Sequence, residues 1–302
     1  MGAGESELRH EMNRQEWDDY SRTVTGEMRG YAWPFVASIL RVHSLEEASL
    51  LGSGTYLQLL DNCYLLTNQH VAAERRTHSL AHLLADEEFA LGISGVFQAL
   101  SDPVDAAVCR IEQGVWNSGK TMKRAVPIAR LAQKHDPVER ELLFMMGFSG
   151  ERFYFSNLLE SACPTATPYC TQESVVSEEL KSDFHFGLRY STERAVSLDA
   201  SGRGLPDPHG FSGSVVWNTR AVEYLLSGRR WTPENAEVTG MVRRWSDRHA
   251  CLLATRIEFV RSFLLQALRQ EAAYFRWESR GRPVGDDLAD WTWAVGEIPD
   301  LR

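Results

Sequence analysis

Short apolar runs separated by turn-forming residues recur along most of this chain, and they restrict it to a fold built mainly from β-strands. The runs are rich in β-branched and aromatic residues, and glycine, proline or charged clusters separate them. They lie near 33–42, 52–60, 63–68, 89–99 and 105–112, and then near 141–147, 151–161, 184–198, 213–218, 236–245 and 250–255. A segment at about 114–138 connects the two groups. The pattern predicts an all-β barrel or sandwich.

The two ends of the chain depart from the strand pattern. Residues 1–30 are polar, and we expect them to form a partly helical extension. Over 257–277 the apolar residues adopt helical spacing while polar residues take the other face, which predicts an amphipathic helix. Residues 278–302 form an acidic tail that contains tryptophan.

Composition excludes several classes of function. At 302 residues and 43% hydrophobic, the chain can bury one large core or two modest ones. A net charge of −9 argues against nucleic-acid and anionic-membrane partners, which select clustered basic residues. No apolar run approaches the roughly 18 residues of a membrane-spanning helix, and the N-terminus lacks the apolar region of a secretory signal. We therefore expect a cytoplasmic protein.

Cysteine usage favours a reducing compartment. The five cysteines are an odd number with no Cys-x-x-Cys spacing. Cys63, Cys109 and Cys251 lie in apolar strands, where reduced cysteine behaves as a small hydrophobe. Cys163 and Cys170 flank a Pro/Thr segment, and their pairing under oxidising conditions stays open. A disulfide framework is not expected.

His70, Asp105 and Ser212 occur in an order and in local settings that suit a catalytic triad. A serine hydroxyl is a poor nucleophile, so a neighbouring imidazole must accept its proton, and a carboxylate must orient that imidazole. His70 follows an apolar strand, Asp105 opens an alternating one, and Ser212 lies in Gly210-Phe211-Ser212-Gly213-Ser214. We assign Ser212 as nucleophile, His70 as general base and acid, and Asp105 as orienter. Glycine allows unusual backbone turns, so the amides of Gly210 and Ser212 are the candidate oxyanion hole.

These motifs resemble those of trypsin-like serine peptidases, nearest to bacterial Htr-type proteases. Gly52-Ser53-Gly54 and the stretch from Cys63 to Val71 resemble the family's "GSG" and "LTN.HV" segments, and Asp105 to Ile111 resembles its "DLAVL(K/R)I" strand. Gly210 to Ser214 resembles "GNSGGP", although Ser214 and Val215 replace the second glycine and the proline. The resemblance covers about 33–268. The tail is too short for the PDZ domain that Htr-type relatives carry.

The resemblance implies a chymotrypsin-like double six-stranded β-barrel with a closing C-terminal helix. We expect a polar extension at 1–30, a first barrel at 31–130 and a second at 131–256, followed by the helix at 257–277 and the tail at 278–302. It also implies an acyl-enzyme mechanism that uses no cofactor.

Three other interpretations compete with the assignment of Ser212 and Asp105. Ser149 lies in a second Gly-Phe-Ser-Gly, but its flanks predict two strands joined by a hairpin turn. Asp102, beside Pro103, is a rival to Asp105. The nucleophile segment is not the Gly-x-Ser-x-Gly elbow of α/β-hydrolases, because strand rather than helix follows it.

His78 and His82 are the residues whose spacing could suit a metal site. His78 and His82 are four residues apart, on one face if this segment is a helix, with Glu74 nearby. The His-Glu-x-x-His pattern of zinc enzymes is missing, since Ser79 follows His78. The pattern favours a solvated helix and no metal.

Positions that line the primary substrate pocket in the family fall here on Pro206, Asp207, Met241, Val242, Arg243 and Arg244. An acidic Asp207 would favour a basic substrate residue through a charge-assisted contact. Pro206, however, occupies the place where the trypsin-type acid falls.

The sequence thus predicts an intracellular, bacterial serine endopeptidase that acts on a protein or peptide substrate. No trypsin-type zymogen cleavage motif is present, so a partner or loop ordering is expected to control activity. A dedicated regulatory or defence-associated role fits the resemblance. A catalytically inactive binding module of the same fold is the alternative, and an esterase with the same triad is the third possibility.

Overall fold

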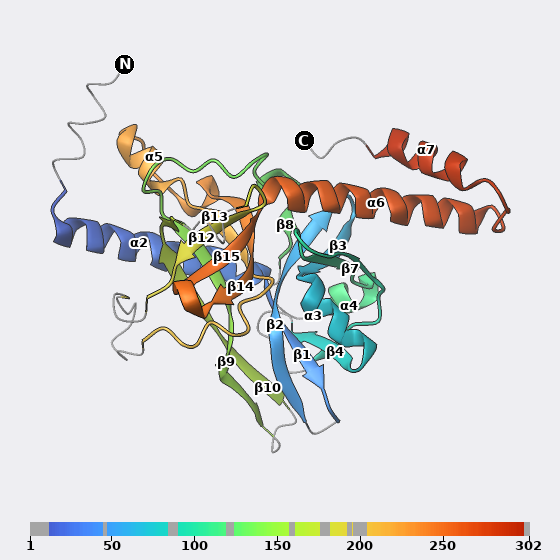
Figure 1. Ribbon diagram of the computed structural model, residues 1–302, viewed down its shortest axis with the longest axis horizontal. Helices are drawn as coiled ribbons and strands as arrows, with labels where there is room; N and C mark the ends of the chain where they lie inside the picture. The colour runs from blue at the N-terminus through green and yellow to red at the C-terminus, as the bar shows by residue number, and fades with distance from the viewer. Residues whose placement is uncertain are drawn as a thin grey trace.

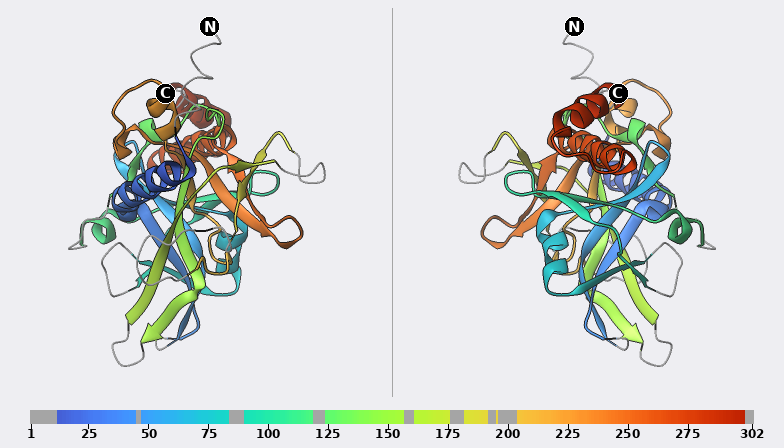
Figure 2. Two further views of the ribbon diagram at one scale, coloured as in Figure 1. Left: turned by 90° about the vertical axis from the view of Figure 1, so that its left-hand side faces the viewer. Right: turned by 90° about the vertical axis from the view of Figure 1, so that its right-hand side faces the viewer.

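Two antiparallel sheets, one in each half of the chain, make up most of the molecule, and a long helix follows them (Figures 1 and 2). The computed structural model describes residues 12–44, 47–83, 90–118, 124–156, 161–175, 182–191, 195 and 204–298. The arrangement confirms the predicted mainly-β, chymotrypsin-like architecture of two curled barrels with a C-terminal helix.

The first sheet places the ends of two of its strands side by side. Its strand order is β5-β4-β1-β2-β3-β7-β6, with β8 beside β2. The strands are β1 (Val36–Val42), β2 (Ala48–Leu59), β3 (Asn62–Thr67), β4 (Ser79–Leu83), β5 (Leu91–Gly92), β6 (Phe97–Leu100), β7 (Ala106–Arg110) and β8 (Val126–Pro127). In the antiparallel pair β3–β7, Thr67 lies opposite Ala107. The residue after β3 and the residue before β7 therefore share one edge of the sheet.

The second sheet has the order β10-β9-β13-β14-β15-β12-β11. Its strands are β9 (Leu143–Ser156), β10 (Ser161–Thr171), β11 (Glu173–Ser174), β12 (His185–Arg189), β13 (Val215–Asn218), β14 (Glu237–Ser246) and β15 (Cys251–Arg256). Strand β13 begins directly after the predicted nucleophile segment and pairs with β14, where Val215 lies opposite Met241. The nucleophile segment is therefore held against the middle of the second sheet.

Helices cover the outside of the sheets. They are α2 (Arg14–Ala32), α3 (Gln69–Ala73), α4 (Gln113–Ser118), α5 (Ala221–Leu226), α6 (Ile257–Ser279) and α7 (Asp287–Glu297), with single 3-10 turns at Trp33–Phe35, Glu74–Arg76, Ile128–Arg130, Pro233–Asn235 and Asp247–His249. Asn13 caps α2, because its side chain accepts from the amide of Glu16 while the Glu16 side chain accepts from the amide of Asn13.

One apolar core joins the two sheets. It combines Leu66 and Val108 from the first sheet with Phe144 and Trp217 from the second, and α2 and α6 contribute to the same cluster. Trp217 is almost fully buried and packs edge-on against Tyr31 of α2, with ring centroids 5.7 Å apart. The shared core fixes the relative position of the two sheets, since moving one would open a cavity.

Helix α6 confirms the predicted amphipathic helix and contacts both halves. Its first turns bury Val260, Leu264 and Leu268 in the shared core. Further along, Glu271 accepts a hydrogen bond of 2.5 Å from Tyr64 of β3. Burial, together with that carboxylate, raises the pKa of Tyr64.

Residues 147–150 do not form the predicted hairpin turn. Strand β9 continues through this segment, and Phe148 lies opposite Ala166 of β10, with an irregularity in the register directly after Phe148. Gly147 serves close packing here, because a Cβ at this position would overlap the hydroxyl of Ser214. Glycine permits both turns and close approach, and the sequence pattern does not separate the two uses.

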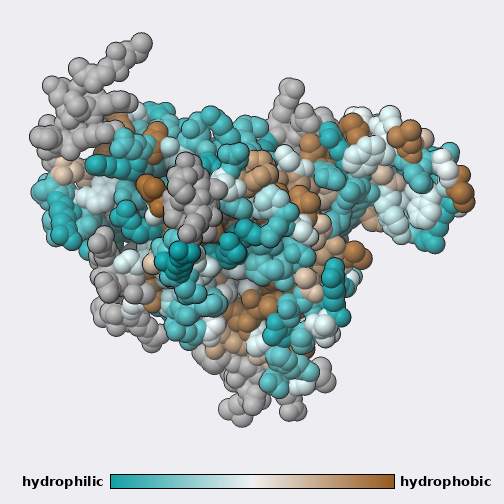
Figure 3. All heavy atoms as spheres, in the orientation of Figure 1, coloured by the Kyte–Doolittle hydropathy of each residue, from teal (hydrophilic) through white to brown (hydrophobic). Residues whose placement is uncertain are grey.

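One other local prediction was wrong. The segment with His78 and His82 is not a helix: Ser79–Leu83 forms strand β4, in which His82 is buried and bonded to Tyr56. The acidic tail contains a helix, α7, which folds back on α6. Figure 3 shows apolar side chains near the end of this α6–α7 hairpin, on an otherwise largely polar face. Its partly exposed apolar residues are Tyr274, Phe275, Leu288, Trp293 and Val295.

Within the described residues, every helix is too short or too polar to span a lipid bilayer. Cys163 and Cys170 lie on the same strand, β10, and the side chain of Cys163 is outside the described part. Among the described side chains, Cys63, Cys109, Cys170 and Cys251 form no disulfide bond.

Candidate active site

His70 and Asp105 meet at the shared edge of β3 and β7. His70 lies in α3, directly after β3, and Asp105 lies directly before β7. The ring nitrogen Nδ1 of His70 is 2.8 Å from Asp105 Oδ2, and the backbone amide of His70 donates to Oδ1 over 3.1 Å. Two contacts to one carboxylate fix both the position and the orientation of the imidazole.

Burial differs between the two members of this pair. Asp105 is 5% exposed, whereas half of the His70 side chain is open to solvent. The side-chain amide of Asn68 donates to the backbone carbonyl of Asp105 over 2.8 Å and so helps to fix its position. Asp105 also has a φ of +50°, a conformation that aspartate adopts more readily than most residues. The carboxylate is thus fixed, and the imidazole faces outward.

Asp102 does not contact His70. Its side chain is 76% exposed and bonds to the guanidinium of Arg243. The geometry therefore favours Asp105 over Asp102 as the orienter.

Ser212 lies in a loop that two glycines shape. Gly210 has a φ of +105° and Gly213 a φ of +93°, both in the region that side chains avoid. A Cβ on Gly210 would come within 2.7 Å of the carbonyl of Phe148. The loop is thus restricted to glycine on either side of the serine.

Ser53 fastens this loop to the first sheet. Its backbone amide donates to the carbonyl of Ser212 over 2.9 Å, and its hydroxyl donates to the carbonyl of Gly210 over 2.7 Å. The same hydroxyl accepts from the amide of Phe148 over 2.9 Å. Ser53 is fully buried, so no water competes for these bonds. Gly52-Ser53-Gly54 is part of the family resemblance, but the motif does not indicate this role of its serine.

The amides of Gly210 and Ser212 point away from the surrounding chain. The carbonyl of His209 accepts from Gly150 over 3.2 Å, and that of Phe211 accepts from Ser214 over 3.0 Å. In a trans peptide the N–H points opposite to the C=O, so the next amide in each case faces the other side. No described residue accepts a hydrogen bond from either amide. Both are therefore available to a negatively charged oxygen.

The Ser212 hydroxyl is bonded to the backbone and not to His70. It donates to the carbonyl of Arg243 over 3.1 Å, and among the described residues no hydrogen bond joins it to the His70 ring. A rotation about the Cα–Cβ bond of Ser212 moves this hydroxyl while its backbone stays in place. Loose serine–histidine contacts are common in substrate-free enzymes.

Arg243 reaches from β14 to the acidic side of the site. Its side chain is 11% exposed, and its Nε lies 3.6 Å from Asp105 Oδ2. His185 lies beside it and donates through Nε2 to the carbonyl of Pro103 over 2.7 Å. Burial, with a further contribution from the nearby arginines, lowers the pKa of His185. No local sequence pattern predicts this contact, because Arg243 and Asp105 are far apart in the chain.

The predicted substrate-pocket residues are only partly placed to contact a substrate. Met241 and Val242 are fully buried in the sheet core, so a substrate cannot reach their side chains. The Arg243 side chain points to Asp105, which leaves Arg244 as the exposed member of this strand segment.

Asp207 is already engaged by its neighbours. Its carboxylate accepts from the amide of His209 over 2.8 Å and contacts the His209 ring. The amide bond, followed by the ring contact, lowers the pKa of Asp207. The Asp207 carbonyl accepts from Ser149. These contacts turn Asp207 toward β9, and the predicted preference for Arg or Lys stays a prediction.

Aromatic side chains fill the space between the pre-serine loop and the end of β14. The Tyr190 hydroxyl donates to the carbonyl of Pro206 over 2.5 Å. The Tyr190 ring packs edge-on against Trp245 of β14 and against Phe211, with centroids 5.6 Å and 6.0 Å apart. The Tyr190 and Phe211 rings are buried, and no local sequence pattern indicated the role of Tyr190.

Ser149 and the predicted metal candidates lie outside the site. Ser149 is 1% exposed and donates to the Asp207 carbonyl, so it is a structural residue of β9. The described residues contain no cluster of His, Cys, Asp or Glu that could hold a metal ion. Burial lowers the pKa of His82 to about 4.

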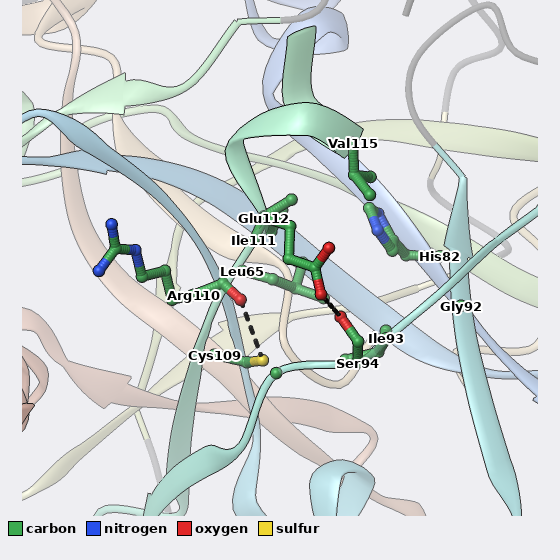
Figure 4. Close-up of a pocket in the computed structure, with 11 residues that line it drawn as sticks. Leu65, His82, Gly92, Ile93, Ser94, Cys109, Arg110, Ile111, Glu112 and Val115 are labelled. Atoms are coloured by element: carbon green, nitrogen blue, oxygen red, sulfur yellow. Dashed lines mark hydrogen bonds between the residues drawn. The ribbon is translucent and has the colours of Figure 1, made fainter. Parts of the chain in front are cut away.

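A small pocket in the first sheet is separate from the candidate site. Figure 4 shows it between β5 and β7, with Leu65, His82 and Cys109 among the residues that line it. Ser94 donates to Glu112 across its rim over 2.6 Å. None of His70, Asp105 and Ser212 lines this pocket.

A family of known proteins matches a short part of the sequence, and solved structures resemble the fold. Residues 270–298 match a family described as protein of unknown function (DUF2934), and they span the end of α6 and α7. No curated protein matches the sequence.

Solved structures resemble the fold at low identity. The Rv3671c protease of M. tuberculosis in its active form is 13% identical, with a TM-score of 0.43 over 78% of this chain and 81% of that chain. An inactive mutant form of Rv3671c is 15% identical, with a TM-score of 0.44 over 80% and 92%. A structure concerning the intrinsically disordered Sesbania mosaic virus VPg protein is 15% identical, with a TM-score of 0.43 over 74% and 87%.

Proposed function

We propose that this protein is a serine endopeptidase that cleaves a protein substrate through His70, Asp105 and Ser212. The observation that carries the proposal is the 2.8 Å contact between His70 Nδ1 and Asp105 Oδ2. Ser212 lies in a loop that two glycines of positive φ shape, and Ser53 of the first sheet bonds to this loop. An oriented histidine in the first sheet and a serine in a loop bonded to that sheet support this assignment.

The reaction begins with a rotation of the Ser212 side chain. Its hydroxyl leaves the carbonyl of Arg243 and turns to Nε2 of His70. That nitrogen takes the hydroxyl proton as the oxygen attacks the substrate carbonyl. The imidazolium then gives this proton to the leaving amine, so that a serine ester remains. Water, activated by the same nitrogen, hydrolyses the ester and regenerates the hydroxyl.

The amides of Gly210 and Ser212 would bind the negative oxygen of the tetrahedral intermediate. Their orientation is set by the bonds that their neighbours' carbonyls make, so no reorganisation is needed during the reaction. Removing one such donor from a serine peptidase typically costs about 3–4 kcal/mol in transition-state stabilisation.

The biological setting remains part of the proposal. The four cysteines with described side chains form no disulfide bond, which fits the proposed reducing, cytoplasmic location. The serine's bond to the Arg243 carbonyl supports control by a substrate or partner that turns the hydroxyl toward His70. A dedicated regulatory or defence-associated substrate fits this form of control.

A fluorophosphonate probe, which reacts with activated serines, tests the proposal directly. We expect labelling of the wild type to be lost in Ser212→Ala and retained in Ser149→Ala. Site mapping by mass spectrometry should find the adduct on Ser212. Cleavage of peptides but not of short-chain esters would separate a peptidase from an esterase. Labelling that survives in Ser212→Ala would contradict the proposed triad.

A non-catalytic binding module is the second candidate function. The observation that favours it is the Ser212 hydroxyl bonded to a backbone carbonyl instead of to His70. Failure of a folded wild-type protein to react with the probe, with and without candidate substrates, would support this function over catalysis.

A further inference from the structure

Arg243 contacts both ends of the proposed catalytic triad. Through its carbonyl it accepts the Ser212 hydroxyl over 3.1 Å, and through its side chain it approaches Asp105. Its backbone position is fixed, because the neighbouring Val242 accepts from Gly213 over 2.9 Å and donates to Ser214 over 2.8 Å. Strand β14 and the nucleophile loop therefore move as one unit.

The guanidinium shares the Asp105 carboxylate with His70. Oδ2 of Asp105 lies 2.8 Å from His70 Nδ1 and 3.6 Å from Arg243 Nε. The buried Nε has no hydrogen-bond acceptor, so this approach is a contact of charges. Arg243 is 9% exposed and Asp105 is 5% exposed, and water therefore screens the contact only weakly.

The other charged groups around this pair are few. Asp102, from the same loop as Asp105, bonds to the far end of the guanidinium. His185 of β12 lies beside the guanidinium, where it donates to the carbonyl of Pro103, and burial lowers its pKa. Arg244 adds a second positive charge from β14.

We propose that Arg243 is a positioning residue that sets the charge balance of the His70–Asp105 pair and thereby the pH range of the reaction. The inference rests on the proposed function. A cation beside Asp105 offsets part of the negative charge that would stabilise a protonated imidazole. Removal of this cation should therefore favour the protonated imidazole, which cannot accept the serine proton. The accompanying cost is a less stabilised imidazolium in the transition state.

Replacing Arg243 and replacing Asp102 should have opposite effects, because Arg243 is the cation and Asp102 is an anion bonded to it. Arg243→Gln removes the cation while keeping a planar amide of similar shape, so the acid limb of the pH–rate profile should move to higher pH. Arg243→Lys keeps the charge and should leave the limb near its wild-type position. Asp102→Asn removes a neutralising anion from Arg243, so the limb should move slightly to lower pH.

The measurement is the rate of fluorophosphonate modification of Ser212 as a function of pH for these four proteins. At about pH 6, the rate of Arg243→Gln relative to its own plateau should fall about threefold or more, because the lost cation lies 3.6 Å from the carboxylate that bonds to His70. Uniform loss of rate at every pH, with an unmoved limb, would mean that Arg243 is only structural and would overturn the inference. Asp102 is exposed, so Asp102→Asn should fold even if the Arg243 variants do not. An acid limb that stays in place in Asp102→Asn, or moves to higher pH, also overturns the inference.

A second readout separates this inference from the proposed function. NMR titration of the His70 ring in Ser212→Ala, with and without Arg243→Gln, needs no catalysis. Absence of wild-type labelling would refute the proposed function alone. An imidazole that titrates at the same pH in both backgrounds would refute the inference alone.

Discussion

Replacing Ser53 by alanine should loosen the nucleophile loop and destabilise the protein. The buried Ser53 hydroxyl is bonded to the carbonyl of Gly210 and the amide of Phe148, at 2.7 Å and 2.9 Å. Ser53→Ala removes the hydroxyl that bonds to the buried amide of Phe148 and to the half-buried carbonyl of Gly210. A buried group left without a partner costs about 1–3 kcal/mol. Because the mutation also removes a buried hydroxyl, we expect a net loss of about 2–4 kcal/mol in the free energy of unfolding.

Thr55 of the same strand offers a matched control. Its hydroxyl is also fully buried, but it makes no hydrogen bond. Thr55→Val therefore removes a buried hydroxyl without orphaning a partner, and it should be neutral or slightly stabilising. The comparison isolates the hydrogen bonds of Ser53 from the general effect of removing a hydroxyl in β2.

Urea unfolding followed by tryptophan fluorescence measures the free energy, and the fluorophosphonate rate at Ser212 measures the effect on the loop. We expect the rate of Ser53→Ala to fall about tenfold or more, since small displacements of a nucleophile are costly. A stability loss below about 1 kcal/mol, or one equal to that of Thr55→Val, would refute the reasoning.

Three further predictions concern other parts of the molecule. Burial lowers the pKa of His82 from 6.5 to about 4, so the unfolded chain binds a proton before the folded protein does as pH falls. The free energy of unfolding should therefore decrease between about pH 6.5 and pH 4, by about 1.4 kcal/mol per pH unit. His82→Asn should flatten this part of the pH profile measured by urea denaturation. Asp290→Ala should increase hydrogen exchange in α7, because the 2%-exposed Asp290 carboxylate bonds to Arg280 over 2.8 Å, whereas Asp287→Ala at the exposed start of the helix should not. Peptides with Leu before the scissile bond should be cleaved faster than those with Arg, because Asp207 is engaged by its neighbours; faster Arg cleavage would show that this carboxylate is free to bind substrate.

The strand pattern and the order of the triad motifs were predictable because they depend on local sequence. Alternating apolar residues after Asp105 predict β7, and the apolar run before His70 predicts β3. Pairing of these two strands then brings His70 and Asp105 together. Here local patterning and tertiary contacts agree.

Contacts between distant segments could not be predicted in this way. The approach of Arg243 to Asp105 depends on how the two sheets pack, and no local pattern carries that information. Gly147 was assigned to a turn because glycine marks turns more often than close contacts, yet its role is to make room for Ser214. Helix α7 is not predictable from its aspartates and tryptophans alone, because Asp290 pairs with Arg276 and Arg280, which lie outside the helix.

Helix α6 spans the joint at which the candidate site is assembled. One part is buried against the sheet that carries Ser212, and another, through Glu271, holds Tyr64 of the strand that leads to His70. The helix therefore contacts both halves of the candidate site, although it contains none of the reacting groups. Loss of the Glu271 carboxylate would release its contact with the strand that leads to His70 and leave its contacts with the shared core in place.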